Sequence, residues 1–169
     1  MKKLKIALLM IVAVVFILPS CKKGPDDPFI SLKSRDGRLI RTWKLTNITG
    51  TYNNDAVTYD GANFTEAGTT DYINATFVMT FDKDAKFSYT ETKTSNFTGA
   101  KATTETDQGY WHWSNSNKNK DFLSCNADLF GLGSGEFFVD GLKTSTLILK
   151  YDDETSTSIT NLTFTFAKQ

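Results

Sequence analysis

The sequence predicts an all-β fold, an antiparallel barrel or sandwich, on three observations. Beyond residue 38, short runs alternate apolar and polar residues, and clusters of Gly, Asn and Asp separate these runs at short intervals. Aromatic residues make up 13% of the chain and threonine is abundant, and both favour the half-buried surface of a sheet. The three prolines stand at positions 19, 25 and 28, so no later strand loses a backbone donor to proline.

About eight strands are expected from the alternation. The first covers residues 39–46, where Trp43 and Leu45 share one face. The others are expected at residues 75–81, 87–94, 102–114, 122–127, 136–140, 145–151 and 156–167. Residues 50–71 are polar with scattered aromatic residues, which predicts a long loop or flap of a kind that usually binds a ligand or moves. The glycine-rich residues 129–135 predict a flexible connection or a strand bulge.

The first 21 residues have the features of a bacterial secretory signal. Three lysines (Lys2, Lys3 and Lys5) precede 13 uncharged residues, Ile6 to Leu18. This run is too short to span a hydrocarbon core, which needs ~20 residues. The residues Leu18-Pro19-Ser20-Cys21 resemble a lipobox, and this resemblance implies cleavage before Cys21 and acyl chains, such as palmitate, on its thiol and new amine. An ordinary signal peptide or an uncleaved membrane helix is the alternative.

These features divide the chain into three parts. Residues 1–20 are the expected lipoprotein signal peptide, and residues 21–38 form a lipidated tether with a short helical turn. That turn is expected to begin at Ser31 and to stop at Gly37. Residues 39–169 form the barrel domain. The expected location is the cell envelope, with the chain anchored to the outer membrane and facing the periplasm or the cell surface.

Charge and cysteine usage exclude two classes of protein. Without residues 1–20 the chain loses three of its 19 basic residues and none of its 19 acidic ones, which leaves a formal charge of −3. With no basic stripe, nucleic acid is not an expected partner. Apart from Cys21 the sequence has only Cys125, so a disulfide framework within the chain is impossible, and Cys125 is expected to be a small buried thiol.

Catalytic and metal chemistry are not expected either, and no cofactor is predicted. His112 is the only histidine, whereas zinc sites use clusters of His, Cys and carboxylate. The residues from Asp82 onward begin like a calcium loop, but Phe87 stands where that loop needs glycine. The glycines of residues 129–135 are not followed by a helix that would hold a phosphate. We therefore expect a protein that is not an enzyme.

The start of the barrel domain carries a resemblance to a known family. A short helical turn that leads into residues 39–45, with Trp43 in the first strand, resembles the opening of a lipocalin. The tether and Trp43-Lys44-Leu45 resemble, more narrowly, the lipocalin-like domains of small Bacteroidetes-type lipoproteins. The resemblance implies an eight-stranded up-and-down antiparallel barrel whose closed end is plugged by Trp43. Two features depart from the family: Arg41 replaces a glycine, and Lys168 is the nearest substitute for an arginine that usually stacks on this tryptophan.

The function expected on this basis is the binding or transport of a small apolar ligand by a membrane-anchored barrel. A barrel of eight strands either fills with side chains or holds one small ligand. Polar groups at the mouth are expected among Tyr59, Tyr89, Tyr110 and His112. Two alternatives remain: a surface glycan-binding or assembly module, and a structural or inhibitory barrel without a ligand. The residues expected to bind the ligand are Phe77, Met79, Phe81, Phe87, Tyr89, Trp111, Trp113 and Phe138.

Overall fold

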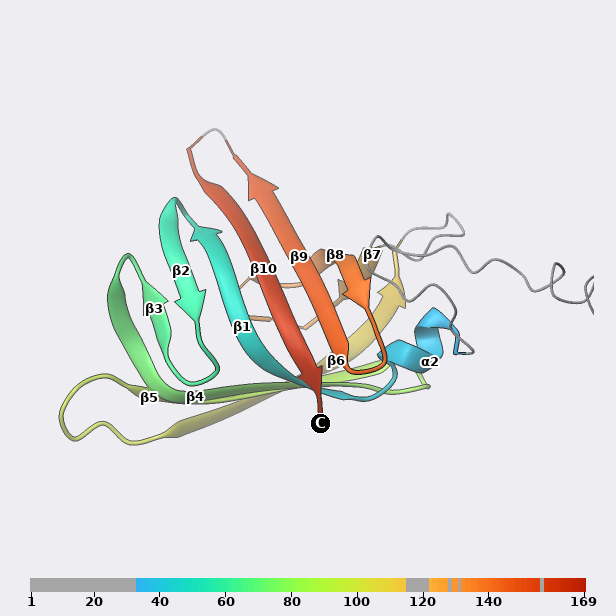
Figure 1. The fold of residues 1–169 in the computed structure, drawn as a ribbon, viewed down its shortest axis with the longest axis horizontal. Helices are drawn as coiled ribbons and strands as arrows, with labels where there is room; N and C mark the ends of the chain where they lie inside the picture. Colours follow the sequence, from blue (N-terminus) through green and yellow to red (C-terminus); the bar gives the residue numbers. More distant parts are fainter. Residues whose placement is uncertain (1–32, 115–121, 128, 131, 156) are drawn as a thin grey trace, which may run out of the picture.

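The computed structural model describes residues 33–114, 122–127, 129–130, 132–155 and 157–169. This part of the chain forms antiparallel strands and one short helix, and the predicted all-β class is confirmed (Figure 1). The elements are α2 (Arg35–Leu39), β1 (Thr42–Tyr52), β2 (Asp55–Tyr59), β3 (Phe64–Glu66), β4 (Thr69–Phe81), β5 (Lys86–Ser95), β6 (Thr103–Trp113), β7 (Phe122–Cys125), β8 (Gly135–Leu142), β9 (Thr146–Glu154) and β10 (Ile159–Lys168). The predicted signal segment, Cys21 and most of the tether lie outside the described residues. No helix among the described residues is long and apolar enough to cross a membrane.

The strands form a closed barrel in which each strand pairs with its neighbours in sequence and β10 returns to β1. The prediction of eight strands is wrong, because ten strands form this barrel. The two additional strands are β2 and β3, in the segment predicted to be a loop. Tight turns with positive φ connect them to their neighbours, at Asn53-Asn54 and at Ala67-Gly68, and such turns match the twist of paired strands.

The insertion of β2 and β3 makes the two ends of the barrel different. At one end β1 pairs directly with β4, through Trp43 opposite Met79 and its two neighbours. Farther along, β1 pairs with β2 instead, through Ile48 to Tyr52, and β2 and β3 lie between β1 and β4. Because barrel diameter grows with the number of strands, the second end is wider. We call the first end, around Trp43, the closed end and the other the open end.

The closed end is filled by Trp43. Its side chain is fully buried, and its indole Nε1 donates a hydrogen bond of 2.9 Å to the Leu39 carbonyl. The Arg41 guanidinium lies over the indole ring, 5.4 Å from the ring centroid. Lys168 is the register partner of Trp43 on β10. The cation that stacks on Trp43 is therefore Arg41, which stands where the resembling family has a glycine. Lys168, the nearest substitute for the stacking arginine of that family, does not supply it.

Helix α2 caps the same end. The Ser34 Oγ accepts a hydrogen bond of 3.1 Å from the Gly37 amide, which is an N-cap interaction. The helix continues through Gly37 to the buried Leu39, so the predicted stop at Gly37 is wrong, because burial of Leu39 against the barrel outweighs the poor helix propensity of glycine. The Asp36 Oδ1 accepts a hydrogen bond of 2.7 Å from the Trp113 indole, which joins α2 to β6.

Candidate binding cavity

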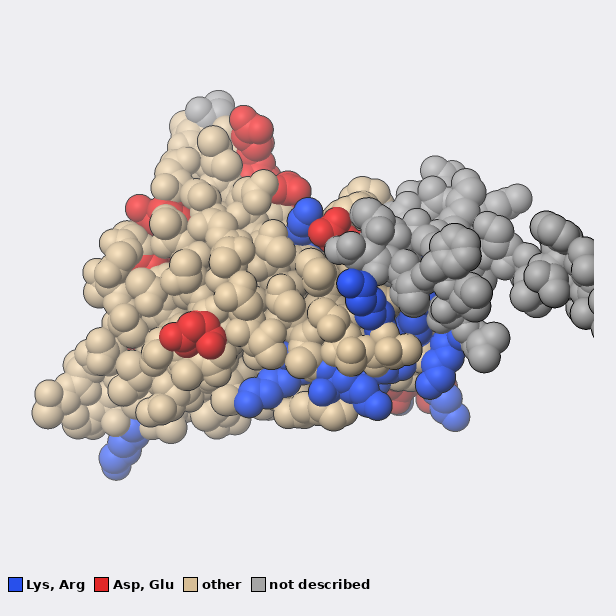
Figure 2. Space-filling view, viewed as in Figure 1, with Lys and Arg blue, Asp and Glu red and all other residues tan. Residues whose placement is uncertain are grey.

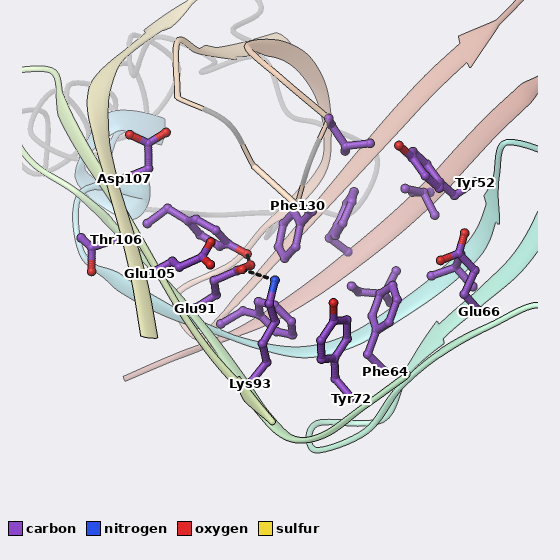
Figure 3. Close-up of a pocket in the computed structure, with 17 residues that line it drawn as sticks. Tyr52, Phe64, Glu66, Tyr72, Glu91, Lys93, Glu105, Thr106, Asp107 and Phe130 are labelled. Carbon is purple, nitrogen blue, oxygen red and sulfur yellow. Dashed lines mark hydrogen bonds and ion pairs between the residues drawn. The ribbon is translucent and has the colours of Figure 1, made fainter. Parts of the chain in front are cut away.

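A cavity of about 530 Å³ lies in the open half of the barrel (Figure 3). This volume is within the range of roughly 300–1,000 Å³ that is typical of small-molecule sites. Strands β1 to β6 and β10 contribute to the wall, together with the connection between β7 and β8. The lining residues are Ile48, Tyr52, Val57, Phe64, Glu66, Tyr72, Phe77, Tyr89, Glu91, Lys93, Glu105, Thr106, Asp107, Phe130, Leu132, Leu162 and Phe164.

The floor of the cavity is a cluster of four aromatic rings. Phe77, Tyr89 and Phe164 point inward from β4, β5 and β10, as alternation along each strand requires. Phe130 reaches them from the connection between β7 and β8. Its ring centroid lies 5.4 Å from Phe77, 5.1 Å from Tyr89 and 4.8 Å from Phe164. These separations are normal for packed aromatic pairs, so the floor is a continuous apolar surface.

One side of the wall comes from the strands that widen the barrel. Phe64 on β3 and Tyr72 on β4 pack with ring centroids 6.2 Å apart. Tyr52, at the end of β1, and Glu66, at the end of β3, also line the cavity and are labelled in Figure 3. All four side chains are half-buried. This side therefore combines aromatic surface with a carboxylate and two phenol hydroxyls.

The adjacent part of the wall, on β5, contains an ion pair. Glu91 is only 8% exposed, and it accepts a hydrogen bond of 2.9 Å from the Tyr89 hydroxyl. The Lys93 ammonium donates to the other Glu91 oxygen and lies 5.0 Å from the centroid of the Tyr72 ring (Figure 3). Burial acts against the charged ammonium, but the hydrogen bond and charge of Glu91, with smaller effects from Tyr72 and Glu105, outweigh it and raise the pKa of Lys93.

Carboxylates outnumber ammonium groups around the cavity. Glu66, Glu91, Glu105 and Asp107 line it, whereas Lys93 is the only Lys or Arg among the lining residues of the described chain. Glu105 on β6 stands directly opposite Glu91 in the ladder between β5 and β6. The formal charge of the wall is therefore negative.

Of the eight residues predicted to bind a ligand, the structure places Phe77 and Tyr89 on the cavity wall. Met79, Phe81, Phe87 and Trp111 are buried but do not line the cavity. They fill the closed half, where the Phe81 ring centroid lies 5.1 Å from Phe87 and 6.0 Å from Trp111. The sequence predicts their inward orientation correctly, but not which half of the barrel each one reaches.

The other two residues of that set lie elsewhere. Trp113 packs at the closed end, with the Arg35 guanidinium 5.5 Å from its ring centroid. Phe138 lies on the outer face of β8, where its ring packs 5.4 Å from Phe122, and the buried residue is its neighbour Phe137. Because Phe137 and Phe138 are adjacent, the sequence pattern does not determine which of the two points inward. The inward orientation predicted for Phe138 is wrong.

The polar residues predicted at the mouth are also distributed over the barrel. Tyr89 is in the wall, but Tyr59 is buried, and its hydroxyl donates a hydrogen bond of 2.7 Å to the Ala75 carbonyl. Burial, and less strongly the charge of Asp60, raise the pKa of Tyr59 to about 12. Tyr110 is 60% exposed and His112 is also exposed, and neither lines the cavity.

Sequence reasoning missed Phe130, Glu91 and Lys93. Phe130 gave no signal, because it lies in a connection and has a positive φ of 58°. Glu91 and Lys93 did give one, because the alternation of Phe87 and Tyr89 continues through them and places all four on the inner face of β5. Charged residues at inward positions of a strand indicate a polar interior rather than the end of the strand.

The remaining chemical groups give no second site. Cys125 is buried as predicted, with a free thiol, and burial raises its pKa to about 12, which makes it unreactive at neutral pH. The described residues contain no group of three or more His, Cys, Asp or Glu side chains that could hold a metal ion.

No family model and no curated protein matches the chain. Among solved structures, japanin from Rhipicephalus appendiculatus, bound to cholesterol, is similar over 76% of this chain and 74% of that chain. The sequence identity is 10% and the TM-score is 0.44. A similarity of this size establishes neither a shared family nor a shared ligand, so the function has to be argued from the cavity of this chain.

Proposed function

We propose that this chain is a lipid-anchored, lipocalin-like barrel that binds or carries a small, mainly apolar ligand and is not an enzyme. The observation that carries the proposal is the cavity of about 530 Å³ with a floor of four aromatic rings. Its volume exceeds the lower limit of roughly 300 Å³ for ligand sites, which a fully packed barrel would not reach. The few polar groups of the wall, Glu91 and Lys93 among them, would orient the ligand.

The position of α2 agrees with an anchor that leaves the cavity accessible. The described chain enters the barrel through α2 at the closed end (Figure 1), and the residues that line the cavity are in the opposite half. A tether from a lipidated Cys21 would therefore reach the barrel on the side away from the mouth. Two or more acyl chains hold a protein stably at a bilayer, whereas one gives marginal binding. We propose the outer membrane as the location. Palmitate labelling of Cys21 tests the anchor, and the membrane fraction that carries the label tests the location.

Ligand binding is best tested with residues 22–169, which contain α2 and all ten strands. Native mass spectrometry of this protein, purified without detergent, is expected to show a retained small apolar molecule. Calorimetry is the suitable measurement, because Trp43, Trp111 and Trp113 do not line the cavity and their fluorescence would not report binding directly. Titration with octanol is expected to release heat, and titration with oligosaccharides is not. Heat from oligosaccharides alone would favour the glycan-binding alternative.

A pair of variants connects binding to the cavity. Leu132 lines the cavity and is half-buried, so Leu132→Trp should fill part of the space and weaken octanol binding at least tenfold. Ile159→Trp is the matched control, because Ile159 is 48% exposed and does not line the cavity. Equal weakening by both variants would contradict the assignment of binding to this cavity. If no molecule is retained and no probe releases heat, the proposal is wrong and the alternative of a barrel without a ligand is favoured.

A further inference from the structure

The charges of the cavity wall distinguish between classes of ligand. Four carboxylates line the cavity, from Glu66, Glu91, Glu105 and Asp107, and one ammonium, from Lys93. Apolar walls exclude water and strengthen electrostatic interactions inside a cavity. An anionic group on a ligand would be repelled by this wall, and a cationic group would be attracted to it.

The ladder between β5 and β6 adds an independent observation. Glu91 and Glu105 are directly opposite each other in the register, and both line the cavity. Like charges in this relation destabilise a pair of strands. The Lys93 ammonium pairs with Glu91, which is 8% exposed. A second cation in the cavity would reduce the repulsion that remains between the carboxylates.

Lys93 also shows how this wall holds an ammonium group. Its Nζ contacts a Glu91 oxygen on one side and lies 5.0 Å from the Tyr72 ring centroid on the other. Carboxylates and aromatic faces within about 6 Å are the two groups that stabilise organic cations in proteins. Glu66 and Phe64, two residues apart on β3, place another carboxylate and another aromatic ring on the wall, and Lys93 on β5 is the only Lys or Arg among the described lining residues.

The charged side chains on the surface of the barrel are also unevenly distributed between its two ends. The exposed residues Asp152, Asp153 and Glu154 end β9 at the open end, where the exposed Lys101 lies between β5 and β6, and most of the Lys and Arg side chains in Figure 2 gather near α2 at the other end. Carboxylates near the mouth that outnumber the ammonium groups raise the local concentration of cations and increase their rate of association.

We propose that the ligand of this cavity is an organic cation, an ammonium group on an apolar body. The inference rests on the proposed ligand-binding function and names its substrate class. The apolar body lies on the ring floor around Phe130, and the ammonium lies against one carboxylate of the wall, either Glu66 on β3 or Glu105 on β6. A fatty acid fits poorly, because Lys93 is already paired with Glu91 and three further carboxylates surround the space.

Three probes with the same eight-carbon chain test the charge preference by calorimetry on residues 22–169. Octyltrimethylammonium is expected to bind at least tenfold more tightly than octanol, and octanoate more weakly than octanol. The preference for the ammonium should shrink in 1 M NaCl, because salt screens charges. If octanoate binds as tightly as octyltrimethylammonium, the cation inference is overturned and the proposed ligand-binding function stands. If no probe binds, both are overturned.

Substitutions test which carboxylates of the wall cause the preference for the ammonium probe. Glu105 is exposed and Glu66 is half-buried, so the double variant Glu66→Gln/Glu105→Gln should fold, and it should weaken octyltrimethylammonium binding at least tenfold and remove its preference over octanol. Glu136→Gln is the control, because Glu136 is exposed on β8 and does not line the cavity. An unchanged preference in the double variant would overturn the assignment of the cation to this wall.

Discussion

The two halves of this barrel are built from the same kinds of residue, but only one of them is filled. Phe81, Phe87 and Trp111 pack beneath Trp43 in the closed half, and Phe77, Phe130 and Phe164 form the floor of a cavity in the open half. The difference lies in the perimeter: β1 pairs with β4 at the closed end, and β2 and β3 separate these strands at the open end. Strand number, rather than hydrophobicity, decides whether this interior is solid or hollow.

The size of the cavity requires that it be open or occupied. An empty apolar void costs about 24 cal/mol per Å³. At this rate, a sealed void of about 530 Å³ would cost on the order of 13 kcal/mol, as much as the whole stability of a typical domain. Polar groups such as Glu91 and Glu105 on the wall allow water to occupy the space instead, and a ligand would displace this water.

The largest expected effect on stability comes from the plug of the closed end. Trp43→Ala should lower the free energy of unfolding by about 3–5 kcal/mol, because it removes a fully buried indole from a packed region. Phe64→Ala, in the half-buried cavity wall, should lower it by only about 1 kcal/mol, because the ring already borders solvent-accessible space. Urea denaturation followed by circular dichroism measures both. Equal losses would mean that the cavity wall is packed as tightly as the plug.

The closed half could be predicted from sequence, and the open half only in part. Trp43 stands in a long alternating strand, so its burial follows from the pattern, as does that of Met79 and Phe81. Strands β2 and β3 are only five and three residues long, and their pairing depends on neighbours distant in sequence as well as on the turns at their ends. Phe130 contributes to the floor through a connection without periodicity. Pattern analysis therefore predicts Phe77 and Tyr89 of the cavity wall, but not the strands and the connection that complete it.

The buried acidic groups predict a loss of stability at alkaline pH. The pKa of the Cys125 thiol is raised from 9.0 to about 12 by burial, and that of Tyr59 from 10.0 to about 12. Above pH 9 the unfolded thiol has lost its proton and the folded one retains it, so the unfolded state binds fewer protons and stability falls as pH rises. The slope is at most about 1.4 kcal/mol per pH unit for each group.

Two variants separate these contributions in urea denaturation at pH 8 to 11. Cys125→Ala should flatten the decline between pH 9 and 10, where neither Tyr59 nor Lys93 contributes much. Tyr59→Phe should flatten it only above pH 10, and Tyr110→Phe, at a side chain that is 60% exposed, should leave it unchanged. If the free energy of unfolding of Cys125→Ala declines between pH 9 and 10 as steeply as that of the unmodified protein, the thiol is accessible to water.

The smallest expected effect separates the two cations beside Trp43. Arg41 lies over the indole ring, and its guanidinium donates to the Thr144 carbonyl and, at 3.1 Å, to the Gly37 carbonyl, so it joins β1 to α2 and to the turn between β8 and β9. Arg41→Ala should cost about 1–2 kcal/mol, the sum of a cation–π contact and charged hydrogen bonds.

Arg41→Lys should recover only part of this loss, because a lysine lacks the planar fork that reaches two carbonyls. Lys168→Ala should cost at most about 0.5 kcal/mol, as is usual for an exposed residue. Urea denaturation of the three variants measures the difference. If Lys168→Ala lowers the free energy of unfolding as much as Arg41→Ala does, the cation that stabilises Trp43 is on the last strand, as the family resemblance implies. Arg41 would then serve only to hold α2 in place.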